Sequence, residues 1–188
     1  MSRLISAIRA RILRRLLRDS AGGALVEFGL ILPTLLLVSF GAIEFTITMF
    51  DYHRLGEAAR RGARQAIMSA PVAKLDTLEA MGTITCTNTG SISCGSATKH
   101  ATASANFSAV LSAIQEIAPG VGASNVSISY TWSGIGDLST PGGIKPVVTV
   151  QLTGVTHQFT LLSIIPALDN IVLPSFSTSV VANAYTTS

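Results

Sequence analysis

Residues 14–50, RRLLRDSAGGALVEFGLILPTLLLVSFGAIEFTITMF, decide the fold of this chain. A basic leader runs into a long apolar stretch, and between Ala24 and Phe50 the only charged residues are Glu27 and Glu44. The sixteen uncharged residues between the two glutamates make about 24 Å of helix. Counting outward to Phe50 makes the helix long enough for a bilayer core of about 30 Å. The stretch therefore predicts one membrane-spanning helix.

The amino-terminal flank of this helix is basic. All ten arginines occur at or before Arg64, and six of them precede the apolar stretch. This asymmetry predicts a cytoplasmic amino terminus, because basic residues stay on the inner side of a membrane. A net charge of +3 could instead indicate nucleic-acid binding, but no basic patch with interleaved aromatic residues follows. We expect no nucleic-acid partner.

Three regions follow from these patterns. Residues 1–22 form a basic leader, residues 23–69 a long helix that spans the membrane and protrudes from it, and residues 70–188 an extracytoplasmic domain. An ordinary secretory signal carries its apolar core before the cleavage site. Here the apolar core follows the glycine pair, so cleavage between the glycines would leave the core attached to the mature protein.

Beyond the long helix the composition changes to small and polar residues. We expect a loop over 82–105, a helix over 103–120 and a strand over 126–132. We then expect one or two strands over 147–159, an apolar connection or short helix over 161–174 and a final strand over 176–186. A helix packed against a small antiparallel sheet gives an α+β fold. The whole chain is then a long amino-terminal helix with a small α+β domain.

Cys86 and Cys94 lie in a stretch rich in Thr, Ser, Asn and Gly. If the domain is outside the cytoplasm, a local disulfide is the expected state. A metal site built from Cys86, Cys94 and His100 is the alternative, although it lacks a fourth ligand and the usual zinc spacing. We expect no metal and no cofactor.

Glu27 is a carboxylate at the head of an apolar helix, where an unpaired charge is costly. Cleavage between Gly22 and Gly23 would create an amine at Gly23, four residues before Glu27. In a staggered stack of subunits, the amine of one subunit could pair with Glu27 of the next and set the axial register. The alternative is an uncleaved signal anchor whose Glu27 lies near the headgroups and whose outer domain is a binding module.

The segment GGALVEFGLILP with its basic leader resembles the prepilin processing region of the Flp/Tad pilus system. Gly22 matches the last leader residue, Gly23 the new terminus, Glu27 the register carboxylate and Phe28 the aromatic residue after it. The stretch EFGLILPTLLLVSFGAIEF, followed by LGEAARRGARQAI, resembles the TadE-like family of pilus-assembly pseudopilins. The resemblance covers about residues 14–67.

The resemblance implies a minor pilin of a type IVb pilus, anchored in the bacterial inner membrane with its outer domain in the periplasm. Its implied partners are a prepilin peptidase, other pilin and pseudopilin subunits and the Tad assembly platform, and its implied role is assembly of an adhesion pilus. Incorporation into the extracellular fibre stays an open alternative. No catalytic motif occurs in the sequence, so we expect no enzymatic activity.

Overall fold

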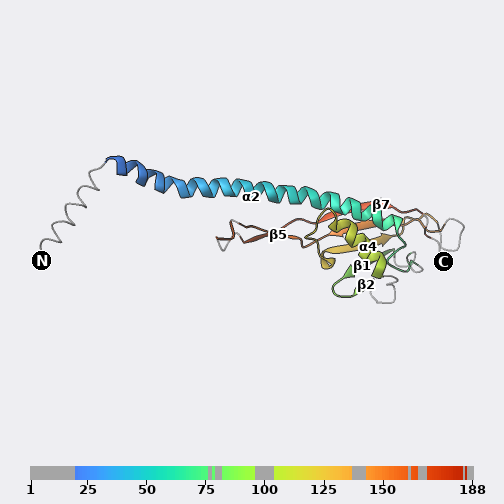
Figure 1. Ribbon diagram of the computed structural model, residues 1–188. Coiled ribbons are helices and arrows are strands. Elements are labelled where there is room, and N and C mark those ends of the chain that lie inside the picture. The colour runs from blue at the N-terminus through green and yellow to red at the C-terminus, as the bar shows by residue number, and fades with distance from the viewer. Residues whose placement is uncertain are drawn as a thin grey trace. The chain divides into compact units, whose positions relative to one another are not determined.

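The computed structural model describes residues 20–75, 78, 82–95, 104–136, 143–160, 162–164, 169–183 and 185. The chain divides into two compact units, residues 1–46 and residues 47–188. The boundary lies inside helix α2 (Ser20–Met68), which is 49 residues long and continues through Pro33. Figure 1 shows α2 as the longest element of the chain.

The first unit contributes the apolar part of α2. In the described part of the chain, one helix, Gly22–Met68, is long and apolar enough to cross a membrane. Its most apolar stretch of 18 residues is not buried inside the molecule. In a soluble protein, a core helix would bury such a stretch. The length, composition and exposure of α2 therefore agree with the expected spanning helix.

The second unit combines the carboxyl-terminal part of α2 with an antiparallel sheet, a second helix and a small hairpin (Figure 1). The sheet has five strands in the order β2-β1-β3-β4-β7, and the hairpin pairs β5 with β6. This arrangement confirms the predicted α+β fold. The bounds of the helices and strands are α4 Ser104–Gln115, β1 Thr83–Asn88, β2 Ile92–Cys94, β3 Val126–Thr131, β4 Val147–Leu152, β5 Thr156–Gln158, β6 Asn170–Val172 and β7 Phe176–Val181, with short 3-10 turns at Ala123–Asn125 and Leu162–Ile164.

The core of this unit lies between one face of the sheet and the two helices. The sheet contributes alternate residues of β1, β3 and β4, as expected for strands with one buried face. Helix α4 contributes three residues at helical spacing, and α2 contributes mainly alanines. The members are Ile84, Ile128, Tyr130, Val148, Val150 and Leu152 from the sheet, Phe107, Val110 and Ile114 from α4, and Leu55, Ala58, Ala59, Ala63 and Ala66 from α2.

Gly62 marks the closest approach of α2 to the rest of the core. A Cβ atom placed on Gly62 would lie 2.7 Å from Cγ1 of Ile114 and 3.4 Å from Cγ1 of Val150. Real Cβ atoms do not approach other atoms to 2.7 Å, so only glycine fits without a shift in α4. The small residues of α2 thus allow the helix to lie directly on both α4 and β4.

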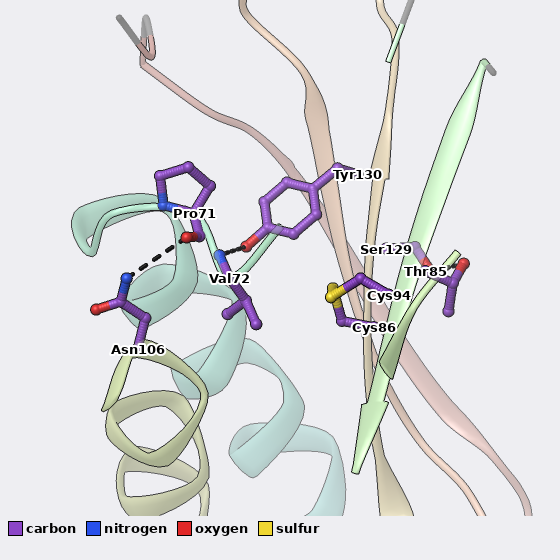
Figure 2. The surroundings of a disulfide bond; sticks show 8 residues. All are labelled: Pro71, Val72, Thr85, Cys86, Cys94, Asn106, Ser129 and Tyr130. Atoms are coloured by element: carbon purple, nitrogen blue, oxygen red, sulfur yellow. Dashed lines mark hydrogen bonds between the residues drawn. A yellow bond between two sulfur atoms is a disulfide. The ribbon is translucent and has the colours of Figure 1, made fainter. Parts of the chain in front are cut away.

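The opposite face of the sheet carries a row of hydroxyl groups. Thr85, Ser129, Thr149 and Ser179 form one row across four strands. The hydroxyls of Thr85 and Ser129 are 2.9 Å apart, and those of Thr149 and Ser179 are 2.8 Å apart. Figure 2 shows the first of these pairs beside the disulfide. Cross-strand hydroxyl bonds of this kind stabilise a sheet modestly.

Two tyrosines bind the last turn of α2 and the segment that follows it. The hydroxyl of Tyr185 donates to the carbonyl of Ala66 at 3.0 Å, and the Tyr130 hydroxyl accepts from the Val72 amide at 3.0 Å (Figure 2). Burial raises the pKa of Tyr130 to about 12, although the Val72 hydrogen bond opposes the shift. Burial also raises the pKa of Tyr185, and Tyr130 beside it adds to the effect. Both tyrosines therefore stay neutral donors and acceptors at physiological pH.

The prediction of a loop over 82–105 was wrong for its first half. Residues 83–88 and 92–94 form the hairpin β1–β2, with a turn at Gly90, whose φ of 111° suits glycine. In β1 the buried residues Ile84 and Cys86 alternate with exposed threonines. The threonines made the segment look like a polar loop by composition, whereas its period of two was the signal of a strand.

The close packing at Gly62 gives a prediction for folding stability. Gly62→Ala should lower the free energy of unfolding by about 1–2 kcal/mol, because overpacking costs about 1–3 kcal/mol and alanine regains up to about 1 kcal/mol of helix propensity. The measurement is urea unfolding of the detergent-solubilised full chain, followed by the fluorescence of Trp132, the only tryptophan.

The matched control is Gly56→Ala in the same helix. The nearest atom to a Cβ on Gly56 is Cδ1 of Phe176, at 4.0 Å. This substitution should therefore stabilise the protein by up to about 1 kcal/mol. Equal effects of the two alanines would contradict the packing constraint at Gly62.

Candidate functional site

The predicted processing site lies in the first turns of α2. Gly22 is half-buried and Gly23 is exposed. A Cβ atom added to Gly23 would have no neighbour within 4 Å, so the absence of a side chain there is not explained by packing inside the molecule. A bare, exposed backbone is what a peptidase needs for close approach.

Glu27 and Phe28 follow on the same helix, and both side chains are exposed. Glu27 comes four residues after Gly23, which corresponds to a rise of about 6 Å and nearly one full turn. Residues four apart share a helix face, so the predicted new amine and the carboxylate lie on one side of α2. Glu44 differs from Glu27 because it is buried, with 4% of its surface exposed.

Cys86 and Cys94 lie directly opposite each other in the hairpin β1–β2. Their Cα atoms are 4.0 Å apart and their sulfurs form a disulfide (Figure 2). Both residues are fully buried on the core side of the sheet. The bond closes the edge strand β2 onto β1 and needs an oxidising compartment to form and persist.

The alternative metal site does not fit this arrangement. The sulfurs of Cys86 and Cys94 are bonded to each other, so neither is available as a thiolate ligand. His100 lies outside the described residues. In the ranges that the structure describes, no group of three or more His, Cys, Asp and Glu side chains could hold a metal ion.

A polar cluster that the sequence did not predict forms where the apolar stretch of α2 ends. The Nδ1 atom of His157 lies 2.8 Å from an oxygen of Asp51, and the other oxygen of Asp51 lies 3.7 Å from Arg54. The Nε atom of Arg54 donates to the carbonyl of Ile117 at 2.8 Å, and its guanidinium lies 5.4 Å from the ring centre of Phe50. Asp51 and His157 are 106 residues apart, which is why no motif could reveal their contact.

This cluster borders a half-open pocket of about 100 Å³. The pocket is lined by residues of α2, of the turn after α4, and of the segments around β5 and β6: Asp51, Arg54, Leu55, Ala118, Pro119, Gly120, Val121, Val155, Thr156, His157 and Leu173. Its carboxylate, imidazole and guanidinium already bind one another or the backbone. The pocket therefore lies where three segments of the second unit meet, and the polar cluster joins them.

An exposed apolar helix continues into a small α+β unit, and a glycine pair and a glutamate lie near the start of the helix. The family model described as TadE-like protein matches residues 22–64. The match begins at Gly22 and ends in the part of α2 that packs on the sheet, so it identifies the helix as TadE-like and confirms the family resemblance.

The TadE-like family comprises pilin-like proteins associated with Tad pili, and it is a structural, non-enzymatic family. The helix of this chain is therefore similar to that of TadE-like proteins over residues 22–64. No curated protein and no solved structure matches the chain.

The disulfide gives a second prediction. In the native protein purified without reductant, neither Cys86 nor Cys94 should react with a thiol reagent. Reduction should lower the free energy of unfolding by roughly 2–3 kcal/mol, the value expected for closing so short a loop in the unfolded chain. Thiol labelling with mass spectrometry, followed by urea unfolding with and without reductant, measures both effects.

The control is the double variant Cys86→Ser, Cys94→Ser, whose stability should not respond to reductant. Free labelling of both native thiols would refute the disulfide.

Proposed function

We propose that this chain is a minor pilin, or pseudopilin, of a Tad-type (type IVb) pilus, needed for pilus assembly and adhesion. The TadE-like match that starts at Gly22 carries the proposal. In this proposal a prepilin peptidase of the inner membrane cuts between Gly22 and Gly23. Residues 1–22 are then the removed leader, residues 23–69 the helix, and residues 70–188 the outer α+β domain.

The distribution of charge supports the membrane orientation of the proposal. The arginines that precede the apolar stretch favour a cytoplasmic amino terminus. The outer domain then lies in the periplasm, where the disulfide between Cys86 and Cys94 is compatible with the redox conditions. Extraction of the subunit into an extracellular fibre remains a further step of the proposed function.

Glu27 is the proposed register residue. In the processed protein it lies in the first turns of α2, where the positive end of the helix dipole favours a carboxylate. Its exposed side chain can reach the amine at Gly23 of a neighbouring subunit when the apolar helices pack side by side. Phe28, also exposed, then packs among the apolar helices of other pilin and pseudopilin subunits. The proposed partners are those subunits and the Tad assembly platform.

The mature amino terminus tests the proposal most directly. In cells that contain the prepilin peptidase, mass spectrometry should find a protein that begins at Gly23. In otherwise identical cells without the peptidase, the leader should remain. A leader that stays intact in both strains would refute processing and would favour an uncleaved, signal-anchored binding domain.

Substitution of Glu27 tests its register role. Glu27→Ala should leave membrane insertion and cleavage unchanged but reduce surface pili by at least about tenfold, because breaking a desolvated ion pair costs several kcal/mol and about 1.4 kcal/mol corresponds to a factor of ten. Electron microscopy and quantification of sheared pili measure the effect.

The matched control is Glu57→Ala in the same helix, because Glu57 is exposed and pairs with Arg60 on the surface. This variant should assemble normally, since exposed ion pairs contribute little. Normal pili from Glu27→Ala would remove the register role from Glu27.

A further inference from the structure

Strand β7 forms one edge of the five-stranded sheet. It lies at the end of the order β2-β1-β3-β4-β7 and pairs with β4 along its whole length. Just beyond β7, the amide of Ala182 donates to the carbonyl of Pro146 at 2.9 Å. Bonded residues alternate along an antiparallel pair, so Phe176, Thr178 and Val180 are the residues of β7 whose backbone bonds to β4.

The backbone groups of the other three residues of β7 point away from the sheet. These residues are Ser177, Ser179 and Val181, and each of them is exposed. Among the residues that the structure describes, none forms a backbone hydrogen bond with these three. An edge strand with free N–H and C=O groups is a template for pairing with another strand.

Strand β7 lacks the features that usually prevent such pairing. Natural proteins protect free edges with charged side chains, proline, bulges or short edge strands. β7 has six residues without proline or charge, and residues 170–188 contain no charged side chain. The opposite edge differs, because β2 has only three residues and is joined to β1 by the disulfide between Cys86 and Cys94. Of the two edges, β7 is therefore the one suited to pairing.

The core of the second unit is also incompletely covered at β7. On the core-facing side of β4, Val148, Val150 and Leu152 are fully buried. In β7, Val180 pairs with Val148 and Phe176 pairs with Leu152, but both β7 side chains are only partly buried. A further strand beside β7 would cover these apolar side chains and extend the core by one strand.

We propose that β7 is a docking site for an extended segment of another protein, which adds to the sheet as an antiparallel strand. Its backbone bonds to Ser177, Ser179 and Val181, as in recognition by β-strand addition. Its side chains alternate, with apolar residues beside Phe176 and Val180 and polar residues beside the row of hydroxyls that ends at Ser179. The inference does not require that the chain enters a pilus.

The direction of β7 argues against a second copy of this chain as the occupant. Residues 52–66 of α2 run in the same direction as β7, because Tyr52 contacts Phe176 at the start of β7 and Tyr185, beyond its end, binds Ala66. Antiparallel pairing of two β7 strands would turn this part of α2 in opposite directions in the two copies. Copies inserted in one membrane share one orientation, so they do not pair in this way.

The test uses the full chain in detergent micelles and a synthetic peptide as the probe. The peptide is VVTVQL followed by two lysines for solubility, because VVTVQL is the sequence of β4, the strand that already pairs with β7. Amide hydrogen exchange, resolved to single residues by NMR, reports which backbone groups are bonded.

We expect the amides of Ser177, Ser179 and Val181 to exchange rapidly in the protein alone. At saturating peptide they should exchange at least about tenfold more slowly, since a bonded amide exchanges only when its hydrogen bond opens. The amides of Thr178 and Val180, which bond to β4, should be protected with and without peptide.

Two variants at one position separate backbone pairing from side-chain contact. Ser179→Pro removes the central free donor but no bond to β4, so it should weaken peptide binding at least about tenfold. The matched control is Ser179→Ala, which keeps the N–H group and should bind the peptide as the unchanged protein does. Fluorescence of Trp132 checks that the proline variant is folded, and Val181→Pro repeats the test at the end of the strand.

Three results would overturn the proposal. The first is no added protection at saturating peptide, or equal peptide binding by the proline and alanine variants. The second is protection of the three amides that rises with protein concentration in the absence of peptide, which would indicate a second copy. The third is protection at every concentration in a monomer, which would mean that the edge is covered within the chain.

Discussion

The close packing of α2 on α4 and β4 is the constraint on which the second unit depends. At Gly62 the helix approaches Ile114 so closely that a single methyl group would collide with it. The neighbouring alanines keep the same face of the helix flat. A helix with this face can serve as core on one side and still continue, within the same element, into a mostly apolar segment. The apolar segment and the second unit are therefore joined within one helix.

The transition between the two environments of α2 is chemically sharp. Asp51 and Arg54 come within one turn of Phe50, and His157 reaches them from the hairpin. Asp51, Arg54 and His157 bind one another or the backbone directly after the apolar stretch ends. The guanidinium of Arg54 also lies over the ring of Phe50. A cation–π contact thus joins the last aromatic residue of the apolar stretch to this cluster.

Much of the fold could be predicted from local patterns. The 3.6-residue period revealed α2 and α4, and alternation revealed β3, β4 and β7. The hairpin β1–β2 was missed because its exposed threonines resemble a loop in composition. The Asp51–His157 contact could not be predicted, since two isolated residues far apart in sequence carry no periodic signal. The proposed processing segment could be recognised from the sequence, because its glycines, glutamate and phenylalanine are close together in the chain. The structure of one chain does not show its proposed contact, because the partner is another molecule.

The two tyrosine contacts at the end of α2 have a mechanical consequence. Tyr185 holds Ala66, Tyr130 holds Val72, and Gly62 lies locked beside Ile114. A force along the axis of α2 acts parallel to the surface on which the helix packs. The contacts at Ala66, Val72 and Gly62 are therefore loaded in shear and resist the force together. The tyrosines lie at the end of the helix farthest from the apolar stretch, which places the whole packed length between them and the point of pulling. A force on the apolar part of α2 would thus be distributed over all these contacts and would not break them one after another.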